Sequence, residues 1–249
     1  MTKTVFITGA TSGFGDATAR RFDREGWQTI ISGRRTERLD ALKAELTNPS
    51  HAITLDVTDR ASVEAAFAGL PAEFQPIDVL VNNAGLAVGL EGADAVALED
   101  WELMVDTNIK GLLYCTRTAL PMMVAAGGGH VINLGSVAGA YPYPGGNVYG
   151  ATKAFVHQFT LNLRADLVAK NIGATDIAPG LADTEFSTVR FKGDKSKADA
   201  VYDGIKPITA DDVADAVFWA ATRPKNVNIN SIEMMAGCQA FNPFQVVKG

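Results

Sequence analysis

Apolar residues follow two alternating patterns along the chain. Short runs that are continuously apolar, as in strands buried on both faces of a parallel sheet, predict strands at residues 4–8, 28–32, 52–55, 78–81, 130–134, 172–177 and 231–234. Longer segments with the helical period predict helices at residues 14–25, 37–46, 62–70, 100–126 and 149–170, and a capping-box-like start at residues 209–212 opens a last one. Strands that alternate with helices of this length predict an α/β fold, a doubly wound parallel sheet flanked by helices.

The chain has 249 residues, and no linker, repeat or low-complexity tract interrupts them. We therefore expect residues 1–249 to form a single domain. Within the second predicted helix, Leu39, Leu42 and Leu46 share one face.

Composition narrows the classes of partner. Hydrophobic residues make up 47% of the chain and charged residues 20%, with a formal net charge of -6, which argues against disorder and against a nucleic-acid partner. Cys115 and Cys238 each lie in an apolar stretch and are expected to be buried free thiols, as in a reducing cytoplasm. The first predicted strand leaves no room for a signal peptide, and no apolar run approaches the ~20 residues that span a bilayer. We expect a cytoplasmic protein without a membrane or metal partner.

A glycine-rich loop joins the first predicted strand to the first predicted helix. Residues 8–15 read Thr-Gly-Ala-Thr-Ser-Gly-Phe-Gly. Glycines let the backbone turn sharply and approach a pyrophosphate closely, and the N-terminus of the following helix offers free N–H groups to that anion. The order of strand, loop and helix therefore predicts a phosphate-binding loop rather than an ordinary tight turn.

Two arginines follow the second predicted strand, about twenty residues past this loop. A carboxylate there would accept hydrogen bonds from the 2′-hydroxyl of NAD, but Gly33 supplies none, whereas Arg34 and Arg35 supply two cations suited to a 2′-phosphate. This favours NADP over NAD. The alternative is a solvated basic helix start, which the helix dipole disfavours.

Polar residues also end the third and fourth predicted strands. Asp56 and Val57 would lie at the edge of the sheet where the adenine is expected, although Asp56 fits equally well as a turn residue before the next helix. Residues 82–85 read Asn-Asn-Ala-Gly. Their amides can satisfy the backbone of a neighbouring loop and their small residues leave room for a cofactor, although alone they indicate only a turn.

Tyr149 and Lys153 stand four residues apart, on one face of a predicted helix. An ammonium beside a phenol favours the phenolate, so we expect the pKa of Tyr149 to fall from its reference near 10 towards neutrality. A tyrosine so tuned can donate or accept a proton at physiological pH. Alone, this spacing fits a half-exposed tyrosine beside a solvated lysine better, so its meaning depends on the other motifs.

The remaining motifs complete a family pattern. Ser136 follows the fifth predicted strand, Asn108 lies in the long helix from residue 100, and Pro179, Gly180 and Thr184 follow the sixth strand. In order, T-G-x-x-x-G-x-G, D-V, N-N-A-G, N, S, Y-x-x-x-K and P-G resemble the motifs of a short-chain dehydrogenase/reductase over essentially the whole chain. The resemblance implies a doubly wound Rossmann fold with a single seven-stranded parallel sheet, and a homotetramer.

The resemblance also implies a role for each motif residue. Tyr149 would be the general acid or base at the substrate oxygen, Lys153 would lower its pKa and bind the nicotinamide ribose, and Ser136 would hold the substrate oxygen. Asn108 would hold a water that links Lys153 to solvent. The cofactor would contact Gly9, Thr11, Ser12, Gly13 and Phe14 at the pyrophosphate, Arg34, Arg35, Asp56, Val57, Asn83, Ala84 and Gly85 at the adenosine, and Pro179, Gly180 and Thr184 at the nicotinamide. Preplaced hydroxyls suit hydride transfer to a carbonyl, because that step builds negative charge on oxygen.

Three segments carry a narrower resemblance. Residues 136–149, 184–194 and 226–235 look like those of NADP-dependent 3-hydroxy acid dehydrogenases, which oxidise serine, allo-threonine and 3-hydroxy acids or reduce malonic semialdehyde. Residues 181–208 would form the substrate loop, and residues 226–249 a substrate or interface segment. Arg190 is the best candidate to bind a substrate carboxylate. Lys192, Lys195 and Lys197 of the same loop fit a solvated basic surface at least as well.

Other functions remain open from the sequence. The same fold and catalytic residues could serve another ketone, sugar or alcohol, and Arg190 is what separates that activity from the one on 3-hydroxy acids. A redox-sensing NADP-binding regulator without turnover is the third candidate. The intact set of Asn108, Ser136, Tyr149 and Lys153 argues against it, because a sensor has no need of a tuned phenol.

Two structural questions also remain open. Apolar residues on the two long helices fit a subunit contact or the core of one subunit equally well: Leu112, Leu113, Phe155, Phe159 and Leu163. Gly173 stands at the start of the sixth predicted strand, where we expect it to weaken the strand.

Overall fold

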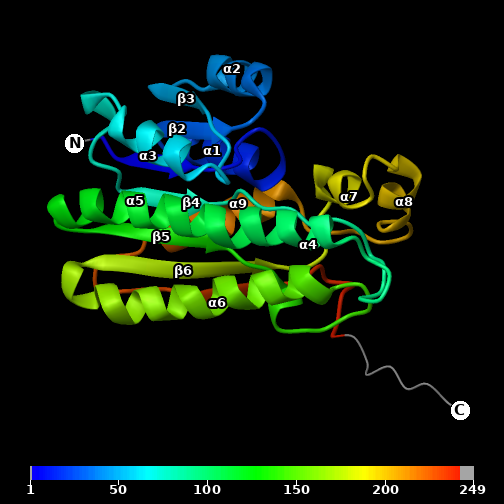
Figure 1. Cartoon of the computed structure of the whole chain (residues 1–249). Coiled ribbons are helices and arrows are strands. Elements are labelled where there is room, and N and C mark those ends of the chain that lie inside the picture. Colours follow the sequence, from blue (N-terminus) through cyan, green and yellow to red (C-terminus); the bar gives the residue numbers. More distant parts are fainter. Residues whose placement is uncertain (1, 242–249) are drawn as a thin grey trace, which may run out of the picture.

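Seven parallel strands form one sheet in the computed structural model of the chain, which describes residues 2–241 (Figure 1). Their order across the sheet is β3-β2-β1-β4-β5-β6-β7. The direction in which strands are added reverses between β3 and β4, which opens a crevice at the carboxyl ends of the neighbouring strands β1 and β4. This is the doubly wound Rossmann fold predicted from the sequence. The strands are β1 (Thr4–Ile7), β2 (Gln28–Gly33), β3 (Ser50–Thr54), β4 (Val79–Asn82), β5 (Gly129–Leu134), β6 (Ile172–Pro179) and β7 (Ser231–Met234).

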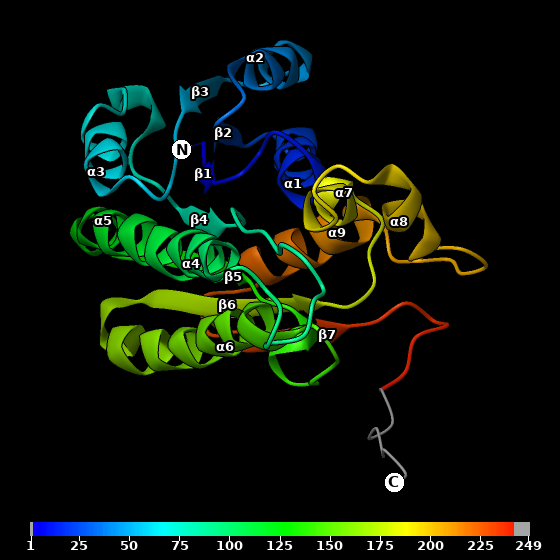
Figure 2. The same cartoon turned by 45° about the vertical axis from the view of Figure 1, so that its right-hand side comes forward.

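Helices cover both faces of the sheet (Figures 1 and 2). One face carries α1 (Gly13–Arg24), α2 (Thr36–Glu45) and α9 (Ala210–Ala221). The other carries α3 (Arg60–Ala68), α5 (Leu112–Ala125) and α6 (Asn147–Leu167), with α4 (Leu98–Val105) leading into α5. Two short helices, α7 (Glu185–Arg190) and α8 (Lys195–Ala200), follow β6 and project beyond one end of the sheet. No helix described within residues 2–241 combines the length and the apolar character needed to cross a membrane.

Each face of the sheet has its own apolar core. Beneath α1 and α9, the ring of Phe22 meets those of Trp27 and Phe218 edge-on, with centroids 5.0 and 5.1 Å away. On the opposite face, Phe6 of β1 stacks on Phe67 of α3 at 4.5 Å. Burying an apolar side chain of this size contributes roughly 1.5–3 kcal/mol. These cores hold the strands in register, and so bring the ends of β1, β4 and β5 together.

The second helix buries the face predicted for it. Leu39 and Leu42 of α2 are 1% and 2% exposed, and Leu46, just past its end, packs against the same core. The apolar pattern therefore located this face correctly, because a surface helix buries its apolar stripe.

The helix predicted over residues 100–126 is not a uniform α-helix, and this prediction was wrong in detail. α4 ends at Val105, a π-helical turn occupies Asp106–Gly111, and α5 continues from Leu112. The apolar pattern could not reveal this, because a single wide turn hardly disturbs the helical period. Turns of this kind occur frequently at functional sites, and here the turn contains Asn108.

Gly173 is accommodated by the packing around it. β6 begins at Ile172, one residue earlier, and a Cβ atom on Gly173 would lie 2.9 Å from Asn228 Oδ1 and 3.2 Å from the ring of His130. The side chains around Gly173 are therefore packed closely at a position where local propensity predicts a weak strand, and a larger residue would have to displace Asn228.

Burial confirms one of the two cysteine predictions and places part of the apolar helix residues in the core of this chain. Cys115 is buried as predicted, but Cys238 is exposed, so an apolar neighbourhood in sequence did not place it in the core. Leu112 and Leu163 are buried within this chain. By contrast, Phe155 and Phe159 are only partly buried, and they stack on each other at 5.6 Å.

Candidate active site

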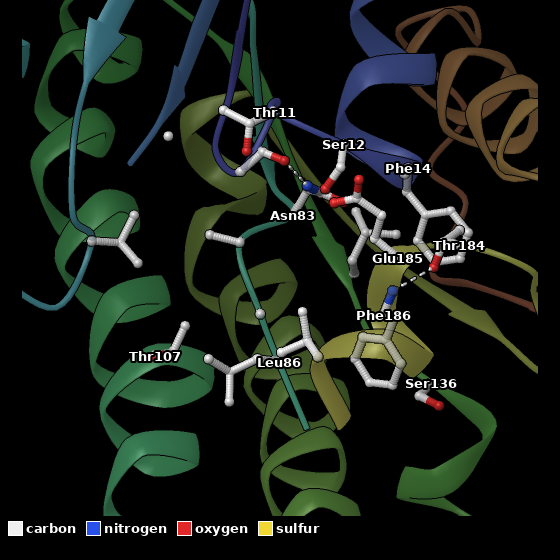
Figure 3. A pocket seen from close by; sticks show the side chains of 18 of the residues that line it. Thr11, Ser12, Phe14, Asn83, Leu86, Thr107, Ser136, Thr184, Glu185 and Phe186 are labelled. Carbon is white, nitrogen blue, oxygen red and sulfur yellow. Dashed lines mark hydrogen bonds between the residues drawn. The ribbon is translucent and has the colours of Figure 1, made fainter. Parts of the chain in front are cut away.

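A cleft of about 330 Å³ lies at the carboxyl ends of the central strands (Figure 3). It brings together residues that are far apart in the sequence, from the glycine-rich loop, the ends of β2 to β6 and the start of α7. The sequence-predicted site residues that line it are Gly9, Thr11, Ser12, Gly13, Phe14, Arg34, Arg35, Asp56, Val57, Asn83, Ala84, Gly85, Ser136, Tyr149, Lys153, Pro179, Gly180 and Thr184. Asn108 and Arg190 do not line this cleft and lie beside it, as described below.

The glycine-rich loop is folded tightly against the end of β4. Gly9 has a φ of 68°, a conformation that glycine adopts without strain, and a Cβ atom on Gly15 would collide with the carbonyl oxygen of Gly9. The amide of Asn83 donates to the carbonyl oxygens of Thr8 and Gly9 at 2.9 and 3.0 Å. This is the support predicted for residues 82–85, and Figure 3 shows Asn83 beside the loop. α1 begins at Gly13, so its first N–H groups lie at the cleft, where an anion is favoured.

Arg35 is held against the glycine-rich loop. Its guanidinium donates to Thr11 Oγ1 at 2.9 and 3.1 Å and to Ser12 Oγ at 2.8 Å. Nη1 also binds the carboxylate of Glu185, at the start of α7, at 2.9 Å. Arg38 binds the second oxygen of Glu185 at 2.6 Å. Burial raises the pKa of Glu185, but the hydrogen bonds from Arg38 and Arg35 outweigh it and hold that pKa below its usual range.

Arg34 is the more available of the two predicted arginines. Its side chain is 65% exposed, and Nη1 lies 4.0 Å from Asp56 Oδ2. The turn role that the sequence offered for Asp56 is confirmed, since its Oδ1 accepts hydrogen bonds from the backbone and hydroxyl of Thr58 at 3.0 and 2.8 Å. Asp56 also lines the cleft, and its contact with the adenine stays a prediction. With arginines rather than a carboxylate after β2, the residues present fit a 2′-phosphorylated dinucleotide.

Tyr149 and Lys153 are both buried on the first turns of α6, with 8% and 7% exposure. The ammonium of Lys153 lies 5.8 Å from the centroid of the Tyr149 ring. It donates a 2.7 Å hydrogen bond to the carbonyl oxygen of Leu134, at the end of β5. The helical spacing therefore places the pair side by side, and β5 fixes the position of the lysine.

The predicted direction of the pKa shift of Tyr149 is wrong for this structure. Burial raises the pKa of Tyr149 to about 12, and Tyr143 adds to this effect, while Ser136 and Arg190 oppose it. Burial also lowers the pKa of Lys153 to about 8, with the charge of Asp176 acting in the opposite direction. The attraction between ammonium and phenolate favours a lower pKa for Tyr149, but the loss of solvent around the buried phenol outweighs it.

Ser136 begins the turn that follows β5. Its hydroxyl donates to the carbonyl oxygen of Pro179 at 3.3 Å and accepts from the backbone N–H of Ala138 at 3.1 Å. Since Ser136 lines the cleft with Tyr149, its hydroxyl lies beside the phenol as well as capping the next turn. These two neighbours hold the oxygen in one place at the base of the cleft.

Asn108 connects the π-helical turn to the wall of the cleft. Its side chain accepts a hydrogen bond from the backbone N–H of Leu86 and donates to the carbonyl of Leu86, both at 2.8 Å, and to the hydroxyl of Thr152 at 3.0 Å. A Cβ atom on Gly85 would lie 3.2 Å from Asn108 Oδ1 and 3.6 Å from Lys153 Nζ. The side chains of Asn108 and Lys153 therefore both lie against Gly85.

Arg190, at the end of α7, reaches over the mouth of the site. Its Cζ lies 5.6 Å from the ring of Tyr149 and 5.3 Å from the ring of Tyr143, and Nη2 donates to the hydroxyl of Tyr143 at 2.6 Å. Two exposed lysines of the same loop pair with other carboxylates instead: Lys192 with Asp100 at 2.8 Å and Lys197 with Asp194 at 3.4 Å. Of these cations, only the arginine faces the phenol of Tyr149.

Sequence reasoning missed several residues of the site. Phe186 packs its ring 5.6 Å from that of Tyr149, and Figure 3 shows it above Ser136. Leu86, Thr107 and Val189 also line the cleft. No motif marks these positions, although the spacing of Phe186 and Val189, three residues apart, would have indicated a helix over Glu185–Arg190. Arg38 could have been predicted to lie beside Arg34 and Arg35, because it follows them by one helical turn.

Comparison with known proteins agrees with this geometry. The sequence profile of the short chain dehydrogenase family matches residues 3–195. Serine 3-dehydrogenase of Agrobacterium fabrum is 54% identical over 100% of this chain and 99% of its own length. NADP-dependent 3-hydroxy acid dehydrogenase YdfG of Salmonella typhi is 56% identical over 95% of this chain and 96% of its own length.

Solved structures give the same result. The closed form of serine dehydrogenase complexed with NADP+ superposes with a TM-score of 0.97 at 53% identity, over 99% of this chain and 100% of that chain. Serine dehydrogenase from Escherichia coli superposes with a TM-score of 0.84 at 50% identity, over 96% and 100%. Fold, cleft and sequence relatives thus agree, and the chain belongs to the short chain dehydrogenase family.

Proposed function

We propose that this protein is an NADP-dependent dehydrogenase that transfers a hydride between the nicotinamide and the 3-hydroxyl group of small 3-hydroxy acids, such as serine, allo-threonine or 3-hydroxypropionate. The observation that carries the proposal is the guanidinium of Arg190, held 5.6 Å from the ring of Tyr149. With the guanidinium this close to the phenol, a short 3-hydroxy acid can bind its carboxylate to Arg190 and place its 3-hydroxyl group at Tyr149. Relatives with 54% and 56% identity, a serine 3-dehydrogenase and an NADP-dependent 3-hydroxy acid dehydrogenase, support this substrate class.

The cofactor site is inferred from the groups that line the cleft. The first N–H groups of α1 and the loop at Gly9 would hold the pyrophosphate. Arg34, with support from Arg35, would bind the 2′-phosphate through charge-assisted hydrogen bonds. Pro179, Gly180 and Thr184 would border the nicotinamide. When bound, NADP supplies the hydride acceptor, and the remaining chemistry is proton transfer and charge stabilisation by the protein.

Tyr149 carries the proton transfer in this proposal. In oxidation its phenolate takes the proton of the substrate hydroxyl, and in reduction its phenol returns it. The hydroxyl of Ser136 donates a hydrogen bond to the substrate oxygen, where negative charge builds up. The ammonium of Lys153 stabilises the phenolate. Asn108 would hold the water that links Lys153 to solvent. Because burial raises the pKa of Tyr149, these cationic and hydroxyl neighbours have to lower it again in the assembled complex.

The substrate assignment is tested by NADPH formation from NADP with a panel of alcohols. The panel contains L-serine, D-serine, allo-threonine, 3-hydroxyisobutyrate, 3-hydroxypropionate and plain secondary alcohols. Activity on the 3-hydroxy acids and none on the uncharged alcohols is the expected result. Activity confined to uncharged alcohols would contradict the substrate class, and would leave the fold and the chemistry of Tyr149 in place.

We further propose that residues 1–249 form one domain, that residues 181–208 form its substrate loop, and that four copies assemble in the cytoplasm. Residues 242–249 of the predicted C-terminal segment lie outside the described residues. Leu98 on α4 and Trp219 on α9 are 60% and 46% exposed, and Phe155 with Phe159 adds an apolar patch on α6. Exposed apolar groups of this size favour subunit contacts. A mass of four chains in light scattering supports the tetramer, and a mass of one chain excludes it.

A further inference from the structure

Asp176 is a buried carboxylate for which the proposed mechanism has no use. It lies in the middle of β6, with 1% exposure, opposite Asn133 of β5 and Ser231 of β7. An isolated carboxylate is strongly disfavoured in an apolar interior, so a buried one requires a partner or a function. These two strand neighbours are uncharged. The charged or titratable groups that act on Asp176 lie on α6, which covers this part of the sheet.

The carboxylate packs directly behind the catalytic turn. A Cβ atom on Gly135 would collide with Asp176 Oδ1, so only glycine fits immediately before Ser136. Among residues 2–241, Oδ1 has no hydrogen-bond partner within normal geometry. One oxygen of this carboxylate thus lies against the turn that carries Ser136, where the backbone N–H of Gly135 opposes the rise that burial causes in the pKa of Asp176.

The second oxygen is bound from α6. Asp176 Oδ2 lies 2.8 Å from Nδ1 of His157, whose side chain is 47% exposed. His157 follows Lys153 by one helical turn. The ammonium of Lys153 donates to the carbonyl of Leu134, and Asp176 lies against Gly135, the next residue, so the two groups meet at the same turn. The two charged or titratable groups that face Asp176 are therefore Lys153 and His157, and both come from one helix.

The electrostatics of the two buried groups are coupled. Burial raises the pKa of Asp176, and His157 and Lys153 oppose this. Burial lowers the pKa of Lys153, and Asp176 opposes that. Each group therefore favours the charged form of the other, although neither is bonded directly to the other.

We propose that Asp176 is a positioning residue for the reaction: it is the buried counter-charge of Lys153, its ionised form is held by His157, and it sets the pH range in which Tyr149 and Lys153 exchange their proton. The inference rests on the proposed roles of Tyr149 and Lys153. It gives a function to the buried carboxylate that lies against the turn leading into Ser136.

The direction of the effect follows from the sign of the charge. A negative charge raises the proton affinity of every group near it, so its removal lets the Tyr149–Lys153 pair lose a proton at lower pH. This holds whichever of the two residues carries the proton, because the titration belongs to the pair. A nearby charge typically shifts a pKa by roughly one to three units, and we expect the loss of this one to move the titration of the pair by about one pH unit.

The test is the pH dependence of kcat/KM for oxidation of 3-hydroxypropionate by NADP, in the wild type and in Asp176→Asn. We expect the acidic limb, on which activity rises as the pair loses its proton, to move down by about one pH unit. Asp166→Asn is the matched control, because it removes the same charge from an exposed position on α6. A uniform loss of activity with an unmoved acidic limb would assign Asp176 a structural role only and overturn the inference.

A second variant guards against misfolding of Asp176→Asn. His157→Leu removes the donor to Asp176 from a half-exposed position, and we expect a shift in the same direction but smaller. His157→Gln, which restores an N–H donor, should return the profile towards that of the wild type. An unmoved acidic limb in His157→Leu contradicts the proposal even if Asp176→Asn does not fold.

A direct titration separates this inference from the proposed function. The ultraviolet absorbance of tyrosinate is followed against pH in the NADP complex, as the difference between the wild type and Tyr149→Phe. Asp176→Asn should shift this titration down, whether or not turnover depends on Tyr149. Activity retained in Tyr149→Phe would defeat the proposed function alone, and an unshifted titration would defeat the role of Asp176 alone.

Discussion

Arg190 donates a 2.6 Å hydrogen bond to the hydroxyl of Tyr143, 47 positions away in the sequence. The bond joins α7 to the loop that precedes α6, and it holds the guanidinium over the phenol of Tyr149. A second contact, from the backbone N–H of Gly89 to the carbonyl of Arg190 at 2.9 Å, fixes the end of α7. The position of the cation is thus set by three segments that only the fold brings together.

Arg190→Ala is expected to lower kcat/KM for L-serine by roughly 10- to 100-fold, mainly through KM, because a charge-assisted bond to a carboxylate contributes roughly 1.5–3 kcal/mol. Steady-state kinetics with NADP in excess measure the effect. Lys197→Ala is the control on the same loop, where the side chain pairs with Asp194 at the surface. If kcat/KM were unchanged in Arg190→Ala, recognition of the carboxylate by this residue would be excluded.

Tyr149→Phe is expected to lower kcat by roughly 10²- to 10⁴-fold, the usual contribution of a general acid or base. Binding of NADPH, followed by quenching of protein fluorescence, should stay nearly the same, because only the hydroxyl is removed. Phe186 and the neighbouring apolar side chains still hold the ring. Wild-type turnover in this variant would remove Tyr149 from the mechanism.

Arg34→Ala is expected to reduce the preference for NADPH over NADH by about tenfold or more, since a phosphate contact of this kind contributes roughly 1.5–3 kcal/mol. KM values for both cofactors measure the preference. Arg24→Ala, an equally exposed arginine at the end of α1 and outside the cleft, serves as the comparison. A wild-type enzyme that used NADH as well as NADPH would refute the assignment of the arginines to a 2′-phosphate.

The stability of the fold should depend on His130 below neutral pH. Burial, with a smaller effect of Arg164, lowers the pKa of His130 to about 4, and Nε2 lies 2.7 Å from the hydroxyl of Thr175. The unfolded chain binds a proton near pH 6.5, whereas the folded one does so only near pH 4, so stability falls as the pH drops through this window. The melting temperature of the wild type should therefore approach that of His130→Gln between pH 7 and pH 4.5. A constant difference between the two proteins would contradict the shift.

Most of the framework could be predicted from local sequence. Apolar runs identified all seven strands of residues 2–241 within about two residues. The five inner strands are mostly buried, and a strand buried on both faces can contain little but apolar residues, whereas the edge strands β3 and β7 are partly exposed. Motif residues from Gly9 to Thr184 line one cleft, and they could be recognised for a similar reason: the phosphate binding and proton transfer that we propose for them suit few residue types. The same reasoning missed the π-helical turn at Asp106–Gly111, since the helical period survives a single wide turn.

The sequence by itself determined the alternation of strands and helices, the glycine-rich loop and the one-turn spacing of Tyr149 and Lys153, because each depends on residues close together in the chain. Only the tertiary structure decided the sign of the pKa shift of Tyr149, the contact of Arg190 with Tyr143, and the place of Asp176 behind Ser136. Desolvation and long-range contacts depend on which segments pack together. That is a property of the whole fold, and no local pattern of residues encodes it.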